Sequence, residues 1–144
     1  MIRPNDARGM TLVELMTVVI IIGIIVAIAI PDYISRMDRV REAATKGNMH
    51  TLQLAAEDYA VENSGSYSTV LDATHIANRL PSSFDNPFSH QGGAGVAWED
   101  RASYSAAPSA IPGIASYADS DTVTYNIKGA GRNGALPLVL STGR

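Results

Sequence analysis

The sequence has no cysteine among its 144 residues, only one tryptophan, and no excess of positive charge. Without cysteine, a disulfide bond and a thiolate metal site are both excluded. The three histidines (His50, His75 and His90) lie far apart and lack the spacing of metal ligands. The formal net charge of −3 does not favour nucleic acid, and the six tyrosines are spread along the chain without interleaved basic residues. We therefore expect no specific nucleic-acid site.

Catalytic motifs are missing as well. The stretch HQGGAG at residues 90–95 lacks both the GxGxxG pattern and the Lys-Ser/Thr pair of phosphate-binding loops. Asp119 and Asp121 flank a serine, a pattern that favours an exposed loop over a cation site. The sequence predicts a protein that is not an enzyme and needs no metal or cofactor.

The most prominent feature is an apolar run from Met10 to Ile30, which ends before Pro31. As an α-helix it would measure about 32 Å, enough to cross a hydrocarbon core of roughly 30 Å. A cleaved secretory signal is the alternative, but its apolar core is shorter, and the proline after AIAI is a poor cleavage context. We predict a membrane-spanning helix.

The residues alone leave its orientation open. Arg3 and Arg8 precede the run, within a short polar segment of residues 1–9. Four basic residues follow it, namely Arg36, Arg39, Arg41 and Lys46. Positive charge near the span therefore does not place the N-terminus in the cytoplasm.

Residues 32–62 continue the helical pattern without a break. Apolar or small residues recur at Met37, Val40, Ala44, Leu52, Ala55 and Tyr59. The pattern predicts one helix of about fifty residues, half in lipid and half outside, which ends at the turn residues Asn63–Ser66.

The remainder of the chain predicts an α+β fold. Residues 67–95 read as a loop with a short helix around 72–79, and five short β-like runs follow, at residues 95–98, 103–106, 114–117, 122–127 and 138–141. We expect these runs to form a small antiparallel sheet that packs against the apolar stripe of the long helix.

Two residues weaken the apolar helix. Gly23 lies in its middle, and Pro31 removes one backbone donor at its end. The residues alone leave open whether the helix loosens between them or whether both are ordinary in a membrane helix.

Glu14 is the only charged residue between Met10 and Ile30. A carboxylate at that depth is costly unless it is paired or reaches water. It either extends to the bilayer surface, or it pairs with a cation from another chain or from processing. A cut between Gly9 and Met10 would create such a cation, an α-amino group four residues before Glu14.

The segment RGMTLVELM at residues 8–16, followed by the apolar run and Pro31, closely resembles the processing site and helix start of type IV pilins and type II secretion pseudopilins. The resemblance implies that a prepilin peptidase cuts between Gly9 and Met10 and N-methylates Met10. It also implies that Glu14 is the acidic residue needed for assembly, where we expect it to pair with the Met10 amine, and that the helix loosens between Gly23 and Pro31.

The same resemblance divides the chain into a cleaved leader (1–9), a transmembrane assembly helix (10–31) and an extracytoplasmic head (32–144). The head comprises an amphipathic helix half (32–62), an αβ-loop (63–95) and a β-sheet with a C-terminal loop (96–144). The chain departs from the family pattern in having Met10 where phenylalanine is usual. It also lacks the cysteine pair that closes the C-terminal loop in many pilins, so that region needs other fastening.

A pilin is the favoured member of this family, because GIASYADSDTVTYNIKGAGRNGALPLVLSTG resembles the terminal sheet of type IVa major pilins. The expected partners are further copies in a helical filament, the bacterial inner membrane before assembly, the prepilin peptidase and the pilus assembly machinery. The expected final location is an extracellular filament that serves adhesion, twitching motility or DNA uptake. The alternatives are a type II secretion pseudopilin and a single-pass membrane-anchored binding domain that never polymerises.

Overall fold

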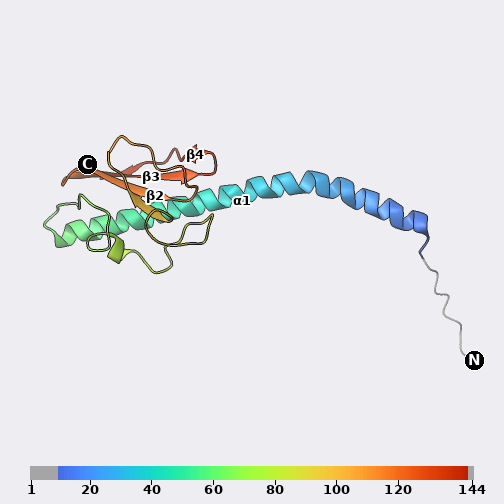
Figure 1. Ribbon diagram of the computed structural model, residues 1–144, viewed down its shortest axis with the longest axis horizontal. Helices are drawn as coiled ribbons and strands as arrows, with labels where there is room; N and C mark the ends of the chain where they lie inside the picture. The colour runs from blue at the N-terminus through green and yellow to red at the C-terminus, as the bar shows by residue number, and fades with distance from the viewer. Residues whose placement is uncertain (1–9, 143–144) are drawn as a thin grey trace, which may run out of the picture. The chain divides into compact units, whose positions relative to one another are not determined.

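The computed structural model describes residues 10–142 of the chain (Figure 1). One long helix is followed by a single short 3-10 turn, η1, and then by five strands. Their bounds are α1 Leu12–Glu62, η1 Ala77–Arg79, β1 Trp98–Asp100, β2 Ala115–Asp121, β3 Thr124–Gly131, β4 Gly134–Ala135 and β5 Leu140–Ser141. The predicted α+β class and the single helix of about fifty residues are confirmed.

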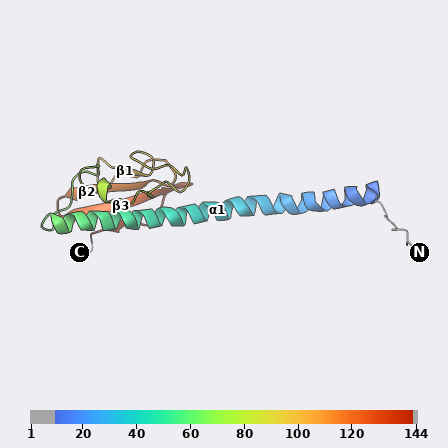
Figure 2. The ribbon, with the colours of Figure 1, turned by 90° about the horizontal axis from the view of Figure 1, so that it is seen from below.

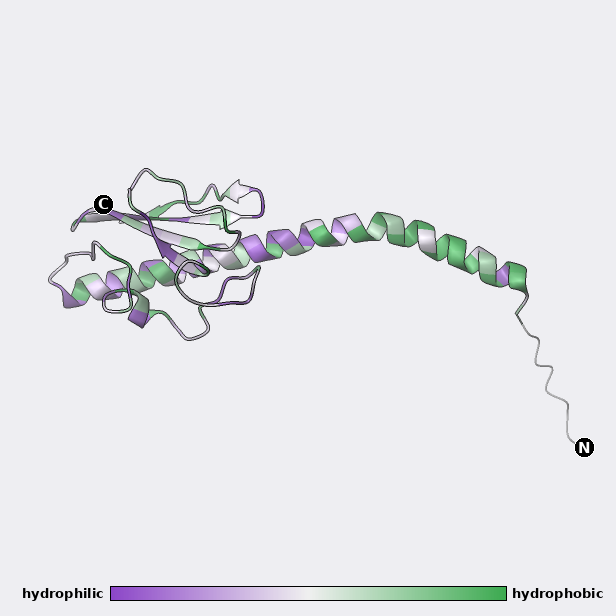
Figure 3. Cartoon of the chain, in the orientation of Figure 1, coloured by the Kyte–Doolittle hydropathy of each residue, from purple (hydrophilic) through white to green (hydrophobic). Residues whose placement is uncertain are grey.

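The described chain forms two compact units, one ending at Met37 and the other starting at Asp38. The first unit is the N-terminal part of α1, which is hydrophobic almost throughout, whereas the rest of α1 is mixed (Figure 3). The second unit, called the head below, contains the rest of α1 and all five strands.

The sheet of the head is mixed rather than purely antiparallel as predicted. Its order is β1-β2-β3-β4, with β5 paired to β3. The pair β1–β2 is parallel, and the pairs β2–β3, β3–β4 and β3–β5 are antiparallel. A parallel pair needs a crossover connection of a dozen or more residues, and the loop between Asp100 and Ala115 supplies it.

Two of the expected β-like runs and the expected short helix differ from the structure. Residues 103–106 form turns, because backbone carbonyls of this segment accept hydrogen bonds from side chains instead of a neighbouring strand. Residues 95–97 are also turn, and β1 begins only at Trp98. In the predicted helix 72–79, the Asp72 carboxylate accepts from the backbone N–H groups of Thr74 and His75, and only Ala77–Arg79 becomes helical.

The buried face of α1 in the head is rotated from the predicted stripe. The buried residues are Thr45, Met49, Leu52, Ala55, Ala56 and Ala60. Leu52 and Ala55 were expected to be buried, whereas the side chain of Val40 is 62% exposed. The polar Thr45 is accommodated because its hydroxyl donates to the carbonyl of Arg41 at 2.9 Å.

Strands β2 and β3 lie along the head portion of α1 (Figure 2), and two glycines set how closely β3 approaches. A β-carbon at Gly129 would lie 2.7 Å from the sulfur of the buried Met49. A β-carbon at Gly131 would lie 2.7 Å from Glu42 Oε1. Alternate residues of β3, namely Tyr125, Ile127, Gly129 and Gly131, therefore share the face of the strand that lies against the helix, with the large side chains first and the glycines after them.

Candidate assembly site

The helix begins with a reciprocal capping box between Thr11 and Glu14. Glu14 Oε2 accepts hydrogen bonds from the Thr11 backbone N–H and from the Thr11 hydroxyl, both at 2.8 Å. In return, the Glu14 backbone N–H donates to Thr11 Oγ1 at 3.2 Å. These bonds satisfy two of the backbone N–H groups that lack partners at the start of a helix.

This arrangement gives Glu14 a partner within its own chain, which the sequence interpretation did not find. The signal was present, because Thr11-Leu12-Val13-Glu14 is the S/T-x-x-E pattern of a capping box. The carboxylate is consequently turned back towards the segment that precedes the helix.

Met10 is the residue immediately before Thr11 and lies outside the helix, with its side chain 67% exposed. Gly9, the other residue of the expected cleavage site, lies outside the described residues. Because Met10 is still joined to Gly9 in this chain, its nitrogen belongs to a peptide bond. Pairing between the Met10 amine and Glu14 remains a prediction.

Gly23 and Pro31 both lie inside the continuous helix α1. A β-carbon added at Gly23 would meet no atom within 4 Å. Within this single chain, then, no packing contact requires glycine at position 23. Loosening of the helix between these two residues remains a prediction about the assembled state.

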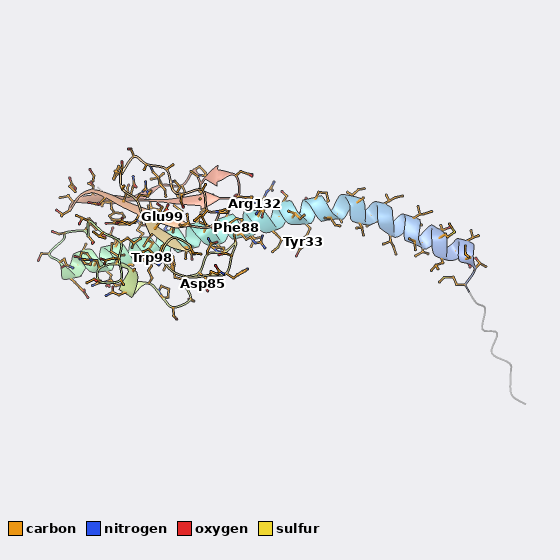
Figure 4. All side chains as sticks on the ribbon, viewed as in Figure 1. Tyr33, Asp85, Phe88, Trp98, Glu99 and Arg132 are labelled. Atoms are coloured by element: carbon orange, nitrogen blue, oxygen red, sulfur yellow. The ribbon has the colours of Figure 1, made fainter. Side chains whose placement is uncertain are left out.

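The apolar side chains of residues 12–30 project from the helix without a partner in the described chain (Figure 4). Leu12 is 73% exposed and Ile28 is 71% exposed. By length and composition, α1 is the only helix in the described chain that could span a membrane. Exposed apolar surface on this scale requires lipid or other protein around it.

In the head, Glu57 of α1 joins three elements. Its carboxylate accepts from the Tyr125 hydroxyl at 2.6 Å and from the Tyr67 hydroxyl at 2.9 Å. The rings of these two tyrosines meet edge to face with centroids 4.7 Å apart. The αβ-loop and β3 are thereby tied to the same residue of the helix.

The buried tyrosines predict a loss of head stability at alkaline pH. Burial raises the pKa of Tyr117, and burial followed by the bond to Glu57 raises the pKa of Tyr125. Above about pH 10 these tyrosines ionise in the unfolded chain but stay protonated in the folded one, so stability falls as pH rises. We expect a decline of at most about 1.4 kcal/mol per pH unit for each such tyrosine.

Urea unfolding of the full chain in detergent micelles, followed by Trp98 fluorescence between about pH 8 and pH 11, measures this decline. Tyr117→Phe removes one titrating group and should make the decline shallower, although it also loses the bond from the Tyr117 hydroxyl to Ser68 O. An unfolding free energy that stays constant up to about pH 11 would contradict the prediction.

Arg101, which directly follows β1, and two side chains from β3 fasten the loop between β1 and β2. The nearly buried Arg101 donates to the carbonyl oxygen of Ala106 at 2.6 Å and to two oxygens of Asn126. Asn126 Nδ2 in turn donates to the carbonyl of Tyr104 at 2.9 Å, and Lys128 Nζ donates to Ala106 O at 3.0 Å. Burial lowers the pKa of the Arg101 guanidinium, whose bonded partners are carbonyl and amide oxygens.

Asn86 performs a similar task for the αβ-loop. Its amide group is 1% exposed, and Nδ2 donates to the carbonyl oxygens of Val96 at 2.8 Å and Pro112 at 2.9 Å. Its Oδ1 accepts from the backbone N–H groups of Phe88 at 2.8 Å and Ser89 at 3.3 Å. Together with the Arg101 contacts, these bonds cross-link loops in a chain that contains no cysteine.

The structure therefore defines a pilin-like architecture, an apolar N-terminal helix that continues into a small α+β head. A family model described as the prokaryotic N-terminal methylation motif matches residues 4–30. No solved structure matches the chain.

Two curated proteins are similar to part of the chain. The type II secretion system core protein G of Pseudomonas aeruginosa is 36% identical over 59 residues, which make up 41% of this chain and 42% of that protein. The type IV major pilin protein PilA of Myxococcus xanthus is 46% identical over 55 residues, which make up 38% of this chain and 25% of that protein. The matches thus span less than half the length of either relative. Together with the methylation motif, they support the type IV pilin and type II secretion pseudopilin family for this chain.

Proposed function

We propose that this chain is a structural subunit that polymerises through its apolar N-terminal helix into a type IV pilus filament. The observation that carries the proposal is the methylation motif over residues 4–30, which includes Gly9-Met10 and most of an apolar helical segment whose side chains are exposed. The similarity to a type IV major pilin supports it. The proposed subunit has no catalytic activity, and adhesion, twitching motility and DNA uptake are the activities that its filament would serve.

In this proposal residues 1–9 are a leader that a prepilin peptidase removes, and Met10 becomes the N-methylated first residue. The Glu14 carboxylate already faces the preceding segment through its bonds to the N–H and hydroxyl of Thr11. After cleavage, the cationic α-amino group would belong to Met10, the residue next to Thr11. It could then pair with the Glu14 carboxylate of the same chain or of a neighbouring chain. Charge neutralisation would then allow Glu14 to enter an apolar bundle of helices.

The same proposal assigns places to the rest of the chain. Residues 10–31 would hold the subunit in the inner membrane before assembly, and the head from residue 32 onward would lie outside the cytoplasm. Other copies of the helix would replace lipid around it during assembly, with Gly23 and Pro31 allowing the backbone between them to loosen. The head would then form the outer surface of the filament on the cell.

A type II secretion pseudopilin is a second candidate, favoured by the similarity to core protein G. It would use the same processing and the same helix in a short periplasmic filament. Electron microscopy of cells for long surface fibres that an antibody against the head labels separates the two candidates. Long labelled fibres support the pilin, and a chain retained in the periplasm supports the pseudopilin.

The mature N-terminus provides the first test. We expect mass spectrometry of the protein purified from its native membrane to show a chain that begins at Met10 and carries one methyl group on its α-amino nitrogen. Cells that lack the prepilin peptidase provide the control and should retain residues 1–9. A mature chain that keeps Met1, or begins elsewhere than Met10, would contradict the proposal and favour a membrane-anchored binding domain that does not polymerise.

A further inference from the structure

A cleft of about 300 Å³ lies in the head where the C-terminal end of α1 meets the αβ-loop and the β2–β3 turn. This volume is at the lower end of the roughly 300–1,000 Å³ of small-molecule sites. Tyr59 lines it from the helix, Tyr67 and His75 from the αβ-loop, and Thr122 from the β2–β3 turn. The proposed assembly of the chain through residues 10–31 involves no residue that lines this cleft.

Hydrogen bonds hold the walls of the cleft in place. The Tyr67 backbone N–H donates to the carbonyl of Thr122 at 2.8 Å, which ties the loop to the turn. The buried Tyr117 hydroxyl donates to the carbonyl of Ser68 at 2.7 Å. His75 Nδ1 lies 2.6 Å from Asp72 Oδ1, which fixes the imidazole ring. The site is therefore formed before any ligand arrives.

The lining offers polar groups that are still available. Within residues 10–142, the hydroxyls of Ser66, Thr69 and Thr122 make no hydrogen bond to the protein, and neither does Nε2 of His75. Each hydroxyl can both donate and accept, and Nε2 accepts when Nδ1 carries the proton. A suitable ligand must therefore present several groups that both donate and accept.

His75 is the only basic residue among the described residues that line the cleft. No lysine, arginine, aspartate or glutamate is among the described residues that line the cleft. Arg79 lies over the Tyr59 ring at 5.2 Å, but its guanidinium is paired with Asp58 and Glu62. Since the neighbouring cation is already neutralised, the site offers little to a negatively charged ligand.

Aromatic rings complete the lining. Tyr59 and His75 have ring centroids 5.8 Å apart and planes tilted by 55°, and Tyr67 contributes a third ring. Such rings pack against apolar C–H faces, while the tyrosine hydroxyls stay polar. A ligand that combines C–H faces with many hydroxyl groups satisfies both parts of the lining.

We propose that this cleft binds a neutral saccharide. One pyranose ring exchanges hydrogen bonds with Ser66, Thr69, Thr122 and His75 Nε2, and its C–H face packs on the ring of Tyr59. A free sugar and a sugar unit of a glycan or polysaccharide share this chemistry. The site belongs to the head, and its binding does not depend on the proposed filament.

Saturation-transfer difference NMR on the full-length chain tests the proposal, with the protein in micelles of a detergent that carries no sugar headgroup. The neutral probes are glucose, galactose, mannose and N-acetylglucosamine, each also offered as a short oligosaccharide, and the anionic probes are glucuronate and N-acetylneuraminate. We expect saturation transfer from the protein to at least one neutral sugar and to none of the anionic sugars. Saturation transfer to the oligosaccharide but not to the free sugar would identify a sugar unit of a glycan or polysaccharide as the ligand.

The variant Ser66→Ala/Thr122→Val removes two of the hydroxyls from exposed positions and should weaken neutral-sugar binding about fivefold or more. Thr69→Val tests the same site independently, and Trp98 fluorescence verifies that each variant is folded. Ser82→Ala, an exposed serine outside the cleft, is the matched control and should bind like the unmodified chain.

Three results would overturn the inference: no neutral sugar binds, the anionic sugars bind as well or better, or the folded cleft variants bind like the control. Because the assay uses monomers in micelles, it is independent of assembly. A chain that forms filaments but binds no neutral sugar contradicts only this inference, and a sugar-binding chain that forms no filament contradicts only the proposed function.

Discussion

If the chain assembles as proposed, replacing Glu14 with alanine should leave membrane insertion and the proposed cleavage before Met10 intact, but reduce the number of surface filaments per cell at least about tenfold. In the alanine variant the Met10 ammonium would enter the helix bundle without a carboxylate. An unpaired buried charge opposes assembly much more strongly than a paired one. Immunoelectron microscopy counts the filaments, and mass spectrometry of the membrane fraction confirms processing.

Two further variants separate charge pairing from helix capping, since Glu14 performs both roles in the proposed subunit. Glutamine at position 14 retains the capping-box geometry but loses the charge. Thr11→Val loses the capping hydroxyl that bonds Glu14 Oε2 at 2.8 Å but keeps the carboxylate. We expect Glu14→Gln to be as defective as the alanine variant and Thr11→Val to assemble. Normal filaments from Glu14→Gln would show that capping, and not the charge, is the function of this residue.

Replacing Asn86 with alanine should destabilise the head by about 3–5 kcal/mol, because four hydrogen bonds are lost at a buried position. That is a large part of the roughly 5–15 kcal/mol that stabilises a typical domain. Gly113 lies directly against this amide, and a β-carbon there would overlap Asn86 Oδ1. The asparagine and the glycine therefore form one fitted contact beneath the loop.

Urea unfolding of the full chain in micelles, followed by Trp98 fluorescence, measures the effect of Asn86→Ala. Asn133→Ala is the matched control, because Asn133 is exposed in the β3–β4 turn, next to Arg132 (labelled in Figure 4). The control should change the free energy of unfolding by no more than about 0.5 kcal/mol. Equal unfolding midpoints for the two variants would mean that water replaces the Asn86 amide at little cost.

In the filament proposed here, any weak saccharide site on the head would be repeated along the fibre. Many identical sites on one scaffold can bind a multivalent surface much more tightly than a single site does. Affinity measured on monomers would then underestimate the retention of whole filaments on a glycan-coated surface.

Several features could be predicted from local sequence because their physical cause is local. The apolar run from Met10 to Ile30 predicts a helix, since a chain in lipid must satisfy its backbone hydrogen bonds within one segment. The helical period that continues past Pro31 correctly predicts that α1 is a single element ending near Glu62. The dipeptide Asn133-Gly134 is typical of a hairpin turn, and it joins β3 to β4, a two-residue strand that was not predicted.

Other features depend on residues that are distant in sequence. The direction of β1 relative to β2 depends on how the intervening loop crosses over, and no residue of β1 indicates it by itself. The buried face of α1 also differs from the predicted stripe. The close approach of β3 to the helix at Gly129 and Gly131 is one contact that the buried face must accommodate. A periodic pattern indicates that a helix has a buried face, but the partner decides which residues occupy it.

The amino-acid sequence by itself determined that this protein has an apolar helix with one acidic residue near its start, because composition and spacing act over a few turns. Only the tertiary structure decided what holds the head together without cysteine. Hydrogen bonds link Arg101, Asn86 and Glu57 to partners at least ten positions away in the sequence. Such hydrogen bonds form only once the folded backbone has brought the partners together.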